Sequence, residues 1–292
     1  MRRQRYIAGA ALLSGLVLGT MIDTTPRHEP INIGGYTVLS GDFHVHAFVG
    51  DGVLAPWMMQ GQAARVGLDV VAITNHDQTL AGRLGRWAAD RLRGPMILVG
   101  EEVTGRDFHL IAVDIEHAVN WNQSARDAIE DVHAQGGVAI AAHPLHGFEG
   151  YDEAALAALD GVEAMYSDSM RPERAQEIEE FYQRALASNP EVATIGSTDF
   201  HTDGPLGSCR TYLLARERNQ TGVVEAIREG RTVSYCESKP PGHGRLRGRP
   251  DLVRLIEPYR DLLAPPRTSL TQYLVMFLVW LSLVALAVLG TR

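Results

Sequence analysis

The sequence contains very little cysteine and almost no lysine. Cys209 and Cys236 are its two cysteines, too few for a disulfide-dense scaffold or a four-cysteine zinc site. Lys239 is the only lysine, and the net charge is -8 at pH 7. This charge argues against a broad surface for duplex nucleic acid, while small nucleotides stay open as substrates.

Several motifs of common catalytic chemistry are missing. The sequence has no P-loop, no dinucleotide-binding glycine fingerprint, no Cys-x5-Arg phosphatase loop and no nucleophile elbow. The two cysteines fall on two late predicted strands, so a single disulfide and two separate buried thiols are both compatible with the sequence.

Two apolar segments, residues 6–22 and 270–290, flank the middle of the chain and carry no charge. They predict an amino-terminal signal anchor and a carboxy-terminal transmembrane helix. Arg2, Arg3 and Arg5 favour a cytoplasmic amino terminus. The middle of the chain is then expected on the extracytoplasmic side of the inner (plasma) membrane.

The region between the two apolar segments has two parts. Residues 30–237 are expected to form one folded domain, and residues 238–269 a basic Pro/Gly linker and juxtamembrane segment. Within the second part, residues 252–263 have the pattern of an amphipathic helix. The arginine excess of this part argues for the opposite orientation, or for contact with anionic membrane lipid.

Short β-branched runs alternate with helical stretches through the folded domain, which is typical of a parallel α/β domain. The alternation is frequent enough to favour a closed or nearly closed barrel over an open sheet. The predicted strands are 36–46, 69–75, 96–104, 108–115, 138–142, 162–166, 192–197, 210–214 and 232–236. The predicted helices are 56–66, 80–93, 122–135, 153–159, 172–187 and 221–229.

Histidines and acids gather at the ends of these strands. Residues two apart on a strand share a face, so His44 and His46 can point toward one ion. Collecting so many titratable groups at one barrel mouth is costly unless cations compensate them. Imidazole and carboxylate without thiolate suit zinc, manganese or iron. The gathered residues are His44, His46, Asp51, His76, Asp77, Glu101, Glu102, His109, His143, Asp199 and His201.

The order of these motifs resembles the PHP (polymerase and histidinol phosphatase) family. HVH with a following aspartate, TNHD, GEEVT, AHP and DFH occur in sequence between residues 42 and 201. The resemblance implies a distorted (β/α)7 TIM-like barrel holding two or three divalent ions. It assigns His44, His46, Glu102 and Asp199 to one ion. Glu102 would bridge to a second ion that His109 and His143 complete, and Asp51, His76 and His201 would hold a third.

One motif departs from the family pattern. Asn75 stands where the family more often has an aspartate, which is expected to tune the site rather than abolish it. Strand parity does not choose between Glu101 and Glu102, whereas the spacing of the family motif selects Glu102. Asp42 and Asp77 either support the ligands or serve as ordinary capping or surface residues.

The expected reaction is hydrolysis of a phosphate ester on a small substrate, such as a nucleotide, by metal-activated water without a covalent phosphoenzyme. Asp51, His76 or His201 would supply a proton to the leaving group. Arg171 is the preferred contact for the substrate phosphate and Arg210 the second. Two alternatives are an amidohydrolase-like hydrolase of C–N or ester bonds and a non-catalytic metal-stabilised binding module at the membrane.

Overall fold

The computed structural model describes residues 2–22, 30–144, 149–166, 172–201, 205–237, 244–265 and 270–290. The chain divides into a large unit, 29–265, and a small unit made of its two ends. In the small unit, helices α1 (Arg2–Ile22) and α10 (Leu270–Gly290) contact each other. Among the residues described, no helix combines the length and apolar character needed to cross a membrane. The two expected membrane spans are therefore not supported.

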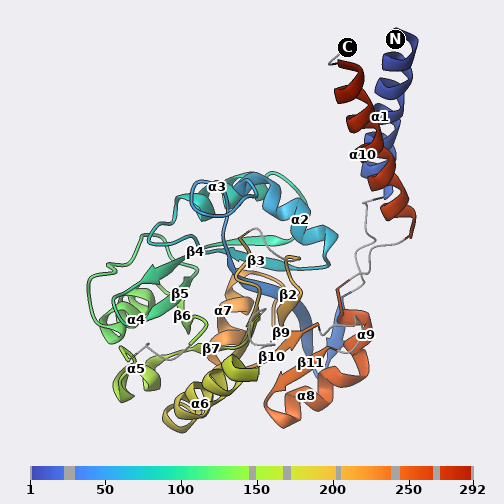
Figure 1. Ribbon diagram of the computed structural model, residues 1–292. Helices are drawn as coiled ribbons and strands as arrows, with labels where there is room; N and C mark the ends of the chain where they lie inside the picture. Colours follow the sequence, from blue (N-terminus) through green and yellow to red (C-terminus); the bar gives the residue numbers. More distant parts are fainter. Residues whose placement is uncertain are drawn as a thin grey trace. The chain divides into compact units, whose positions relative to one another are not determined.

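The large unit is built on one sheet, whose described part has eleven strands (Figure 1). Ten of them follow the path β11-β10-β9-β2-β3-β4-β5-β6-β7-β8, and β1 pairs with β2 beside this path. The strands are β1 (Ile31–Ile33), β2 (Tyr36–Val45), β3 (Val70–Ile73), β4 (Met96–Thr104), β5 (His109–Val113), β6 (Val138–Ala141), β7 (Gly161–Tyr166), β8 (Ala193–Ser197), β9 (Cys209–Ala215), β10 (Thr232–Cys236) and β11 (Arg245–Gly248).

The sheet is mixed, which corrects the expectation of a parallel domain. The pairs β2–β3, β3–β4, β6–β7 and β7–β8 are parallel, whereas β5 runs antiparallel to both β4 and β6. Only residues 105–108 connect β4 to β5, and so short a link cannot make the crossover that parallel strands require. Strand β9 also pairs antiparallel with β2.

The sheet curls until its β8 end approaches β2, so the barrel is nearly closed. The backbone N–H of His46 donates to the carbonyl of Phe200, just beyond β8, at 2.8 Å. Within β8 itself, the Gly196 N–H donates to the hydroxyl of Thr211 on β9 at 2.9 Å. Side-chain and isolated backbone bonds thus replace a regular ladder at the seam. The fold is an α/β barrel of the TIM-like kind that the sequence predicts.

Helices on the outside of the strands form the second layer. Helices α4, α5 and α6 follow one another beside β5, β6 and β7 (Figure 1), and α3 packs on β3 and β4. The helical elements in the described part of this unit are η1 (Pro56–Met58), α2 (Met59–Arg65), α3 (Leu80–Ala89), α4 (Ala125–Ala134), α5 (Glu153–Ala158), α6 (Pro172–Ser188), α7 (Gln220–Arg228), α8 (Pro250–Ile256), η3 (Glu257–Tyr259) and α9 (Arg260–Leu263).

Capping side chains fix where several of these helices begin. Ser124, Asp152 and Asn219 each accept a hydrogen bond from a backbone N–H in the first turn of α4, α5 and α7. Gly136 and Gly230 follow α4 and α7 with φ of 84° and 60°, the left-handed conformation that glycine adopts without strain. These local signals explain why the helices match the sequence-based ranges closely.

An apolar plug fills the interior of the barrel below the strand ends. Leu39, Phe43, Ile140 and Ile195 from the strands form one buried cluster with Ile227 and its neighbours on α7. This apolar cluster occupies one end of the barrel interior, and the histidines and acids that could bind a metal ion gather at the other end.

A bulge in β2 turns the ligand-bearing end of the strand. The register between β2 and β3 shifts between Asp42 and Val45. Phe43 belongs to the interior cluster, but Val45 packs with α2 and α3 outside it. The bulge therefore changes the alternation after Phe43 and directs His44 and His46 toward the barrel mouth.

The expected linker is partly folded. Residues 238–243 and 266–269 lie outside the described residues, but β11 pairs antiparallel with β10 and places Leu246 against a buried cluster. Without β11, this edge of β10 would present unpaired backbone groups, and the pairing satisfies them. The hydroxyls of Thr194 and Ser234 also donate hydrogen bonds to the Arg247 carbonyl on β11. The predicted amphipathic helix corresponds to α8, η3 and α9, and it buries Leu252 and Ile256.

Candidate metal centre

The nine residues predicted as metal ligands meet at one end of the barrel, where the parallel strands end and the antiparallel β5 begins with His109. They form three groups in which the ligand atoms lie within 4.8 Å of one another. The first group is His44, His46, Glu102 and Asp199; the second is Glu102, His109 and His143; the third is His46, Asp51, His76 and His201. The groups match the three predicted sets, with His46 added to the third.

The first group is the most deeply buried. His44 and His46 have no exposed surface, and their Nε2 atoms lie 3.1 Å apart. The Glu102 Oε2 atom is 3.1 Å from His44 Nε2 and 3.2 Å from His46 Nε2. The Asp199 Oδ1 atom is 3.2 Å from His44 Nε2. Four side chains, from the end of β2, the residue just after it, β4 and the loop after β8, therefore point at one small volume.

The second group shares Glu102 with the first. The other carboxylate oxygen, Oε1, lies 2.7 Å from His109 Nδ1 and 3.0 Å from His143 Nε2. Oε2 also lies 3.2 Å from His76 Nδ1. One carboxylate thus faces five histidines with its two oxygens, an arrangement suited to a bridging ligand. His143 has a φ of 24°, an unusual backbone conformation for a side chain of its size.

The third group is the most open to solvent. The exposed fractions of the side chains are 44% for Asp51, 37% for His76 and 31% for His201. The Asp51 carboxylate lies between the rings, with Oδ1 2.9 Å from His46 Nδ1 and Oδ2 3.0 Å from His201 Nε2. A molecule from solvent therefore reaches this group before the other two.

Opposite charges perturb the buried groups strongly. Burial alone would lower the pKa of His44, but Glu163, Glu102 and Asp199 outweigh it and raise that pKa well above its ordinary value. Burial would raise the pKa of Glu102, yet His44 and hydrogen bonds from His109 and His143 hold it well below its usual range. The carboxylates thus stay ionised and attract cations, whether protons on imidazole or metal ions.

The donor set fits divalent metal ions. Among the described residues, the Oδ1 atom of Asp199 is buried and has no hydrogen-bond partner, although it faces His44 and His46. A buried carboxylate oxygen is costly without a partner, and a cation between it and the imidazoles would supply one. Imidazole nitrogens and carboxylate oxygens are ligands that zinc, manganese and iron all accept.

Residues beside the ligands hold their backbones in place. The buried carboxylate of Asp42 accepts hydrogen bonds from the Thr198 hydroxyl at 2.6 Å and from the Gly207 N–H at 3.1 Å. It also accepts from the backbone N–H of Thr198, next to Asp199, and of His44. Burial raises the pKa of Asp42 to about 6, while these donors favour its ionised form. Asp42 therefore supports ligands from two strands.

The TNHD segment supports the site in the same manner. The Asn75 amide donates to the carbonyl of Ala47 at 2.8 Å and accepts from its N–H at 3.1 Å, which fixes the chain after His46. The Asp77 carboxylate accepts from the backbone N–H of Thr104, whose hydroxyl lies 2.7 Å from His76 Nδ1. Asn75 and Asp77 thus contact the surroundings of ligands rather than standing in the ligand groups.

The two arginines expected at the substrate phosphate have different outcomes. Arg171 lies outside the described residues. Arg210 is fully buried, and its guanidinium donates to the backbone carbonyls of Gly207, Gly67 and Val66. Such a guanidinium is not accessible to a phosphate arriving from solvent. The expected phosphate contact by Arg210 is therefore not supported, and its side chain ties β9 to the loop after α2.

Glu163 is the residue that sequence reasoning missed. Its carboxylate is fully buried at the mouth and lies 2.9 Å from His44 Nδ1. The signal was a single acid inside the apolar run 162–166, since a charge on a predicted buried strand needs a partner. Glu163 sits on β7, the strand to which the motif comparison assigned no ligand.

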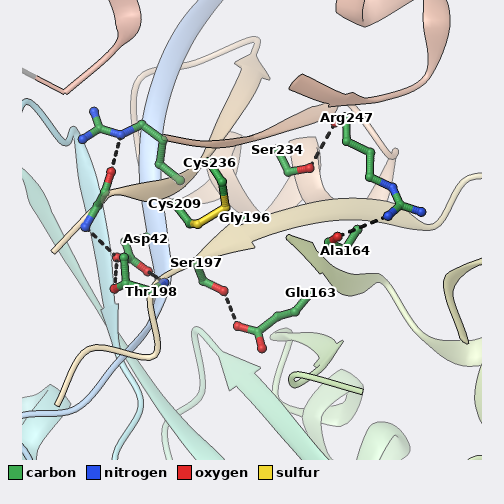
Figure 2. Close-up of a disulfide and its surroundings, with 12 residues drawn as sticks. Asp42, Glu163, Ala164, Gly196, Ser197, Thr198, Cys209, Ser234, Cys236 and Arg247 are labelled. Carbon is green, nitrogen blue, oxygen red and sulfur yellow. Dashed lines mark hydrogen bonds between the residues drawn. A yellow bond between two sulfur atoms is a disulfide. The ribbon is translucent and has the colours of Figure 1, made fainter. Parts of the chain in front are cut away.

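The two cysteines form a disulfide between neighbouring strands. Cys209 on β9 and Cys236 on β10 are paired residues of the antiparallel ladder, with Cα atoms 4.0 Å apart (Figure 2). The bond packs against Met165 on β7. Of the two arrangements that the sequence left open, the structure has the disulfide.

The chain matches no known protein-family model. Part of it is 30% identical over 94 residues to an uncharacterized protein of Methanocaldococcus jannaschii. That match covers 32% of this chain and 54% of the other, so the chain spans about half the length of this relative.

The fold is similar to that of a two-domain protein from Bacteroides vulgatus that contains a predicted PHP-like metal-dependent phosphoesterase. The TM-score is 0.64 and the identity 23%, over 80% of this chain and 74% of that one. At this identity the similarity establishes the fold, a PHP-like barrel.

Two more distant structures are also similar. One is a proposed metal-dependent phosphoesterase from Bifidobacterium adolescentis, with a TM-score of 0.46 and 18% identity over 78% of this chain and 97% of that one. The other is an amidohydrolase from Chromobacterium violaceum, solved with sulfate and no metal, with a TM-score of 0.45 and 20% identity over 57% of this chain and 89% of that one.

Proposed function

We propose that this protein is a metal-dependent hydrolase that cleaves a phosphate ester on a small substrate. The observation that carries the proposal is the position of Glu102, whose two oxygens face the histidines of two separate ligand groups. A shared carboxylate of this kind would hold two cations close together. Paired divalent ions would supply an activated water and neutralise charge on a phosphoryl group.

The residues of the chain have distinct parts in this proposal. His44, His46, Glu102 and Asp199 hold the deepest position, and His109 and His143 complete the second. The third group lies toward solvent, so the substrate approaches along it. When no cation occupies this group, the Asp51 carboxylate and the His201 Nε2 atom, 3.0 Å apart, can hold and deliver the proton that the leaving oxygen needs.

The reaction can be tested by separating metal binding from bond type. The full chain is stripped with a chelator, reloaded in turn with Zn²⁺, Mn²⁺ and Fe²⁺, and assayed with aryl and alkyl phosphates, amides and lactones. We expect metal-dependent release of inorganic phosphate. Turnover of only amides or lactones would contradict phosphoesterase activity and favour an amidohydrolase. Metal binding without any turnover would favour a binding module.

A matched pair of variants strengthens this assay. Glu102→Gln removes the shared carboxylate, whereas Glu101→Gln changes the neighbouring acid, which is fully buried and lies in none of the ligand groups. Phosphate release should be lost in the first variant and retained in the second. Equal loss in both would mean that the activity does not depend on the cluster.

We also propose that the barrel functions outside the cytoplasm. The disulfide between Cys209 and Cys236 supports this location, because such bonds persist in oxidising compartments and are rare in reducing ones. The test is alkylation of thiols in protein taken directly from cells, before and after reduction. Labelling of both cysteines only after reduction is expected, and labelling without reduction would contradict the proposal.

A further inference from the structure

Among the residues that the structure describes, Glu163 on β7 is an acid at the barrel mouth that belongs to none of the ligand groups yet contacts two of them. Its carboxylate is fully buried. One oxygen lies 2.9 Å from His44 Nδ1 and accepts a hydrogen bond from the Ser197 hydroxyl, as Figure 2 shows for Ser197. The other oxygen accepts from the backbone N–H of His143.

The contact with His44 decides which ring nitrogen is free. A carboxylate accepts hydrogen bonds, so the proton of a neutral His44 ring lies on Nδ1, toward Glu163. The lone pair then lies on Nε2, which faces Glu102 Oε2 at 3.1 Å and Asp199 Oδ1 at 3.2 Å. Glu163 thus keeps Nε2, the nitrogen that points into the first ligand group, unprotonated and able to bind a cation.

The contact with His143 acts on the backbone. His143 has a φ of 24°, a conformation that side-chain-bearing residues rarely adopt and that needs support from its surroundings. The hydrogen bond from its N–H to Glu163 gives that support. It holds the His143 ring where Nε2 lies 3.0 Å from Glu102 Oε1, in the second ligand group.

We propose that Glu163 is a positioning residue that couples the two ligand groups sharing Glu102. Its three described partners are His44, His143 and Ser197, none of which belongs to the third group. Loss of the carboxylate should therefore weaken metal binding in the first two groups together and leave the third group unchanged. The inference rests on the proposed metal centre, and not on which bond the enzyme cleaves.

The test compares Mn²⁺ binding to the full wild-type chain and to Glu163→Gln, by titration with electron paramagnetic resonance and by elemental analysis. We expect the ions at the two Glu102 sites to bind about 10–100-fold more weakly in the variant, the usual effect of losing such a hydrogen-bond partner. The remaining ion should keep its wild-type affinity. Adding Asp51→Asn to the variant should weaken the binding of that ion as well.

Two controls separate positioning from general damage. Glu101→Gln removes an equally buried carboxylate that contacts no ligand group. The affinities of this variant for the ions at the three groups should stay within about twofold of wild type. Ser197→Ala removes one hydrogen-bond partner of Glu163 but no metal ligand. It should slightly weaken the binding of the same two ions. A uniform loss at all three groups in Glu163→Gln would overturn the proposal.

A measurement on the wild-type chain keeps the inference testable even if Glu163→Gln fails to fold. In the Zn²⁺-loaded protein, nitrogen NMR should show His44 protonated at Nδ1 and unprotonated at Nε2. Protonation at Nε2 instead would overturn the proposal. Metal binding with these properties but no phosphate release would leave the positioning role intact and contradict the phosphoesterase function alone, whereas absence of any bound ion would overturn both.

Discussion

Glu101 and Glu102 are neighbours on β4 with opposite surroundings. The Glu102 carboxylate faces His44, His109 and His143 at distances of 2.7 to 3.1 Å. The Glu101 carboxylate points away from them, accepts a hydrogen bond from the backbone N–H of Val119, and leaves its Oε2 atom unpaired among the described residues. Successive side chains on a strand point to opposite faces, so one acid serves the site and the other is buried behind it.

This relationship predicts different metal binding by two single-residue variants. Glu102→Ala should bind ions at the first two groups at least about 100-fold more weakly, more than loss of an outer hydrogen-bond partner would cause. Glu101→Gln should bind all ions as the wild type does. Elemental analysis after dialysis measures both. Retention of the full metal content by Glu102→Ala would contradict the shared-ligand assignment.

Glu101 also predicts a dependence of stability on pH. Burial raises its pKa from 4.5 to about 7. Between these values the folded state keeps a proton that the unfolded state has lost, so the free energy of unfolding falls as the pH rises. The loss from this group is about 3 kcal/mol at most and is complete above pH 7.

The measurement is urea unfolding of the metal-free protein and of Glu101→Gln at pH 5 and pH 8. The free energy of unfolding of the wild type should fall more between the two pH values than that of the variant. Equal pH dependence of the two proteins would mean that Glu101 titrates normally. Comparing differences removes the contribution of the histidines, which both proteins share.

Arg210 is predicted to affect stability and not substrate binding. Arg210→Met keeps much of the apolar stem but leaves the carbonyls of Val66 and Gly207 without their donor. Each unpaired buried group costs about 1–3 kcal/mol, so the unfolding midpoint should fall by several degrees. The KM for a phosphate ester should not change below that midpoint. A large rise in KM with unchanged stability would instead indicate that Arg210 contacts the substrate phosphate.

Arg171 stays the preferred phosphate contact predicted from the sequence. Arg171→Ala should raise the KM for phosphate esters while the unfolding midpoint stays at its wild-type value. Its matched control is Arg174→Ala, three residues along the same segment. If both variants have the wild-type KM, neither arginine binds the phosphate in the reaction.

The disulfide is predicted to stabilise the sheet without taking part in the chemistry. Cys209 and Cys236 are 27 residues apart in sequence, and cross-linking such a loop contributes ~2–4 kcal/mol to the free energy of unfolding. The double variant Cys209→Ala with Cys236→Ala should lose about that amount and keep its metal content. Loss of bound metal on selective reduction would instead connect the disulfide to the centre.

Local signals in the sequence were enough to predict most elements of the barrel. Apolar runs located the strands, and capping residues such as Ser124 and Asn219 marked where the helices begin. The antiparallel direction of β5 was not predicted, because the general alternation of strands and helices indicated a parallel domain, although the predicted strands 96–104 and 108–115 left only a short link between them. Strand β11 was assigned to a linker because its stability comes from the edge of β10 rather than from its own arginine-rich sequence.

The candidate site could be predicted because its residues follow a recognisable order along the chain. Contacts between distant segments carried no such signal. Glu163 meets His44 across 119 positions, and Asp42 meets Thr198 across 156. The burial of Arg210 depends on a loop that ends another helix. Packing of the whole barrel fixes these relationships, so local sequence patterns did not reveal them.

Anomalous diffraction from crystals of the full chain grown with Mn²⁺ locates any bound ions at the barrel mouth. We expect anomalous peaks on both sides of the Glu102 carboxylate, one beside His44 and Asp199 and one beside His109 and His143. A further peak is expected between Asp51, His76 and His201. A map at saturating Mn²⁺ with no peak within bonding distance of Glu102 would contradict a metal centre at this carboxylate.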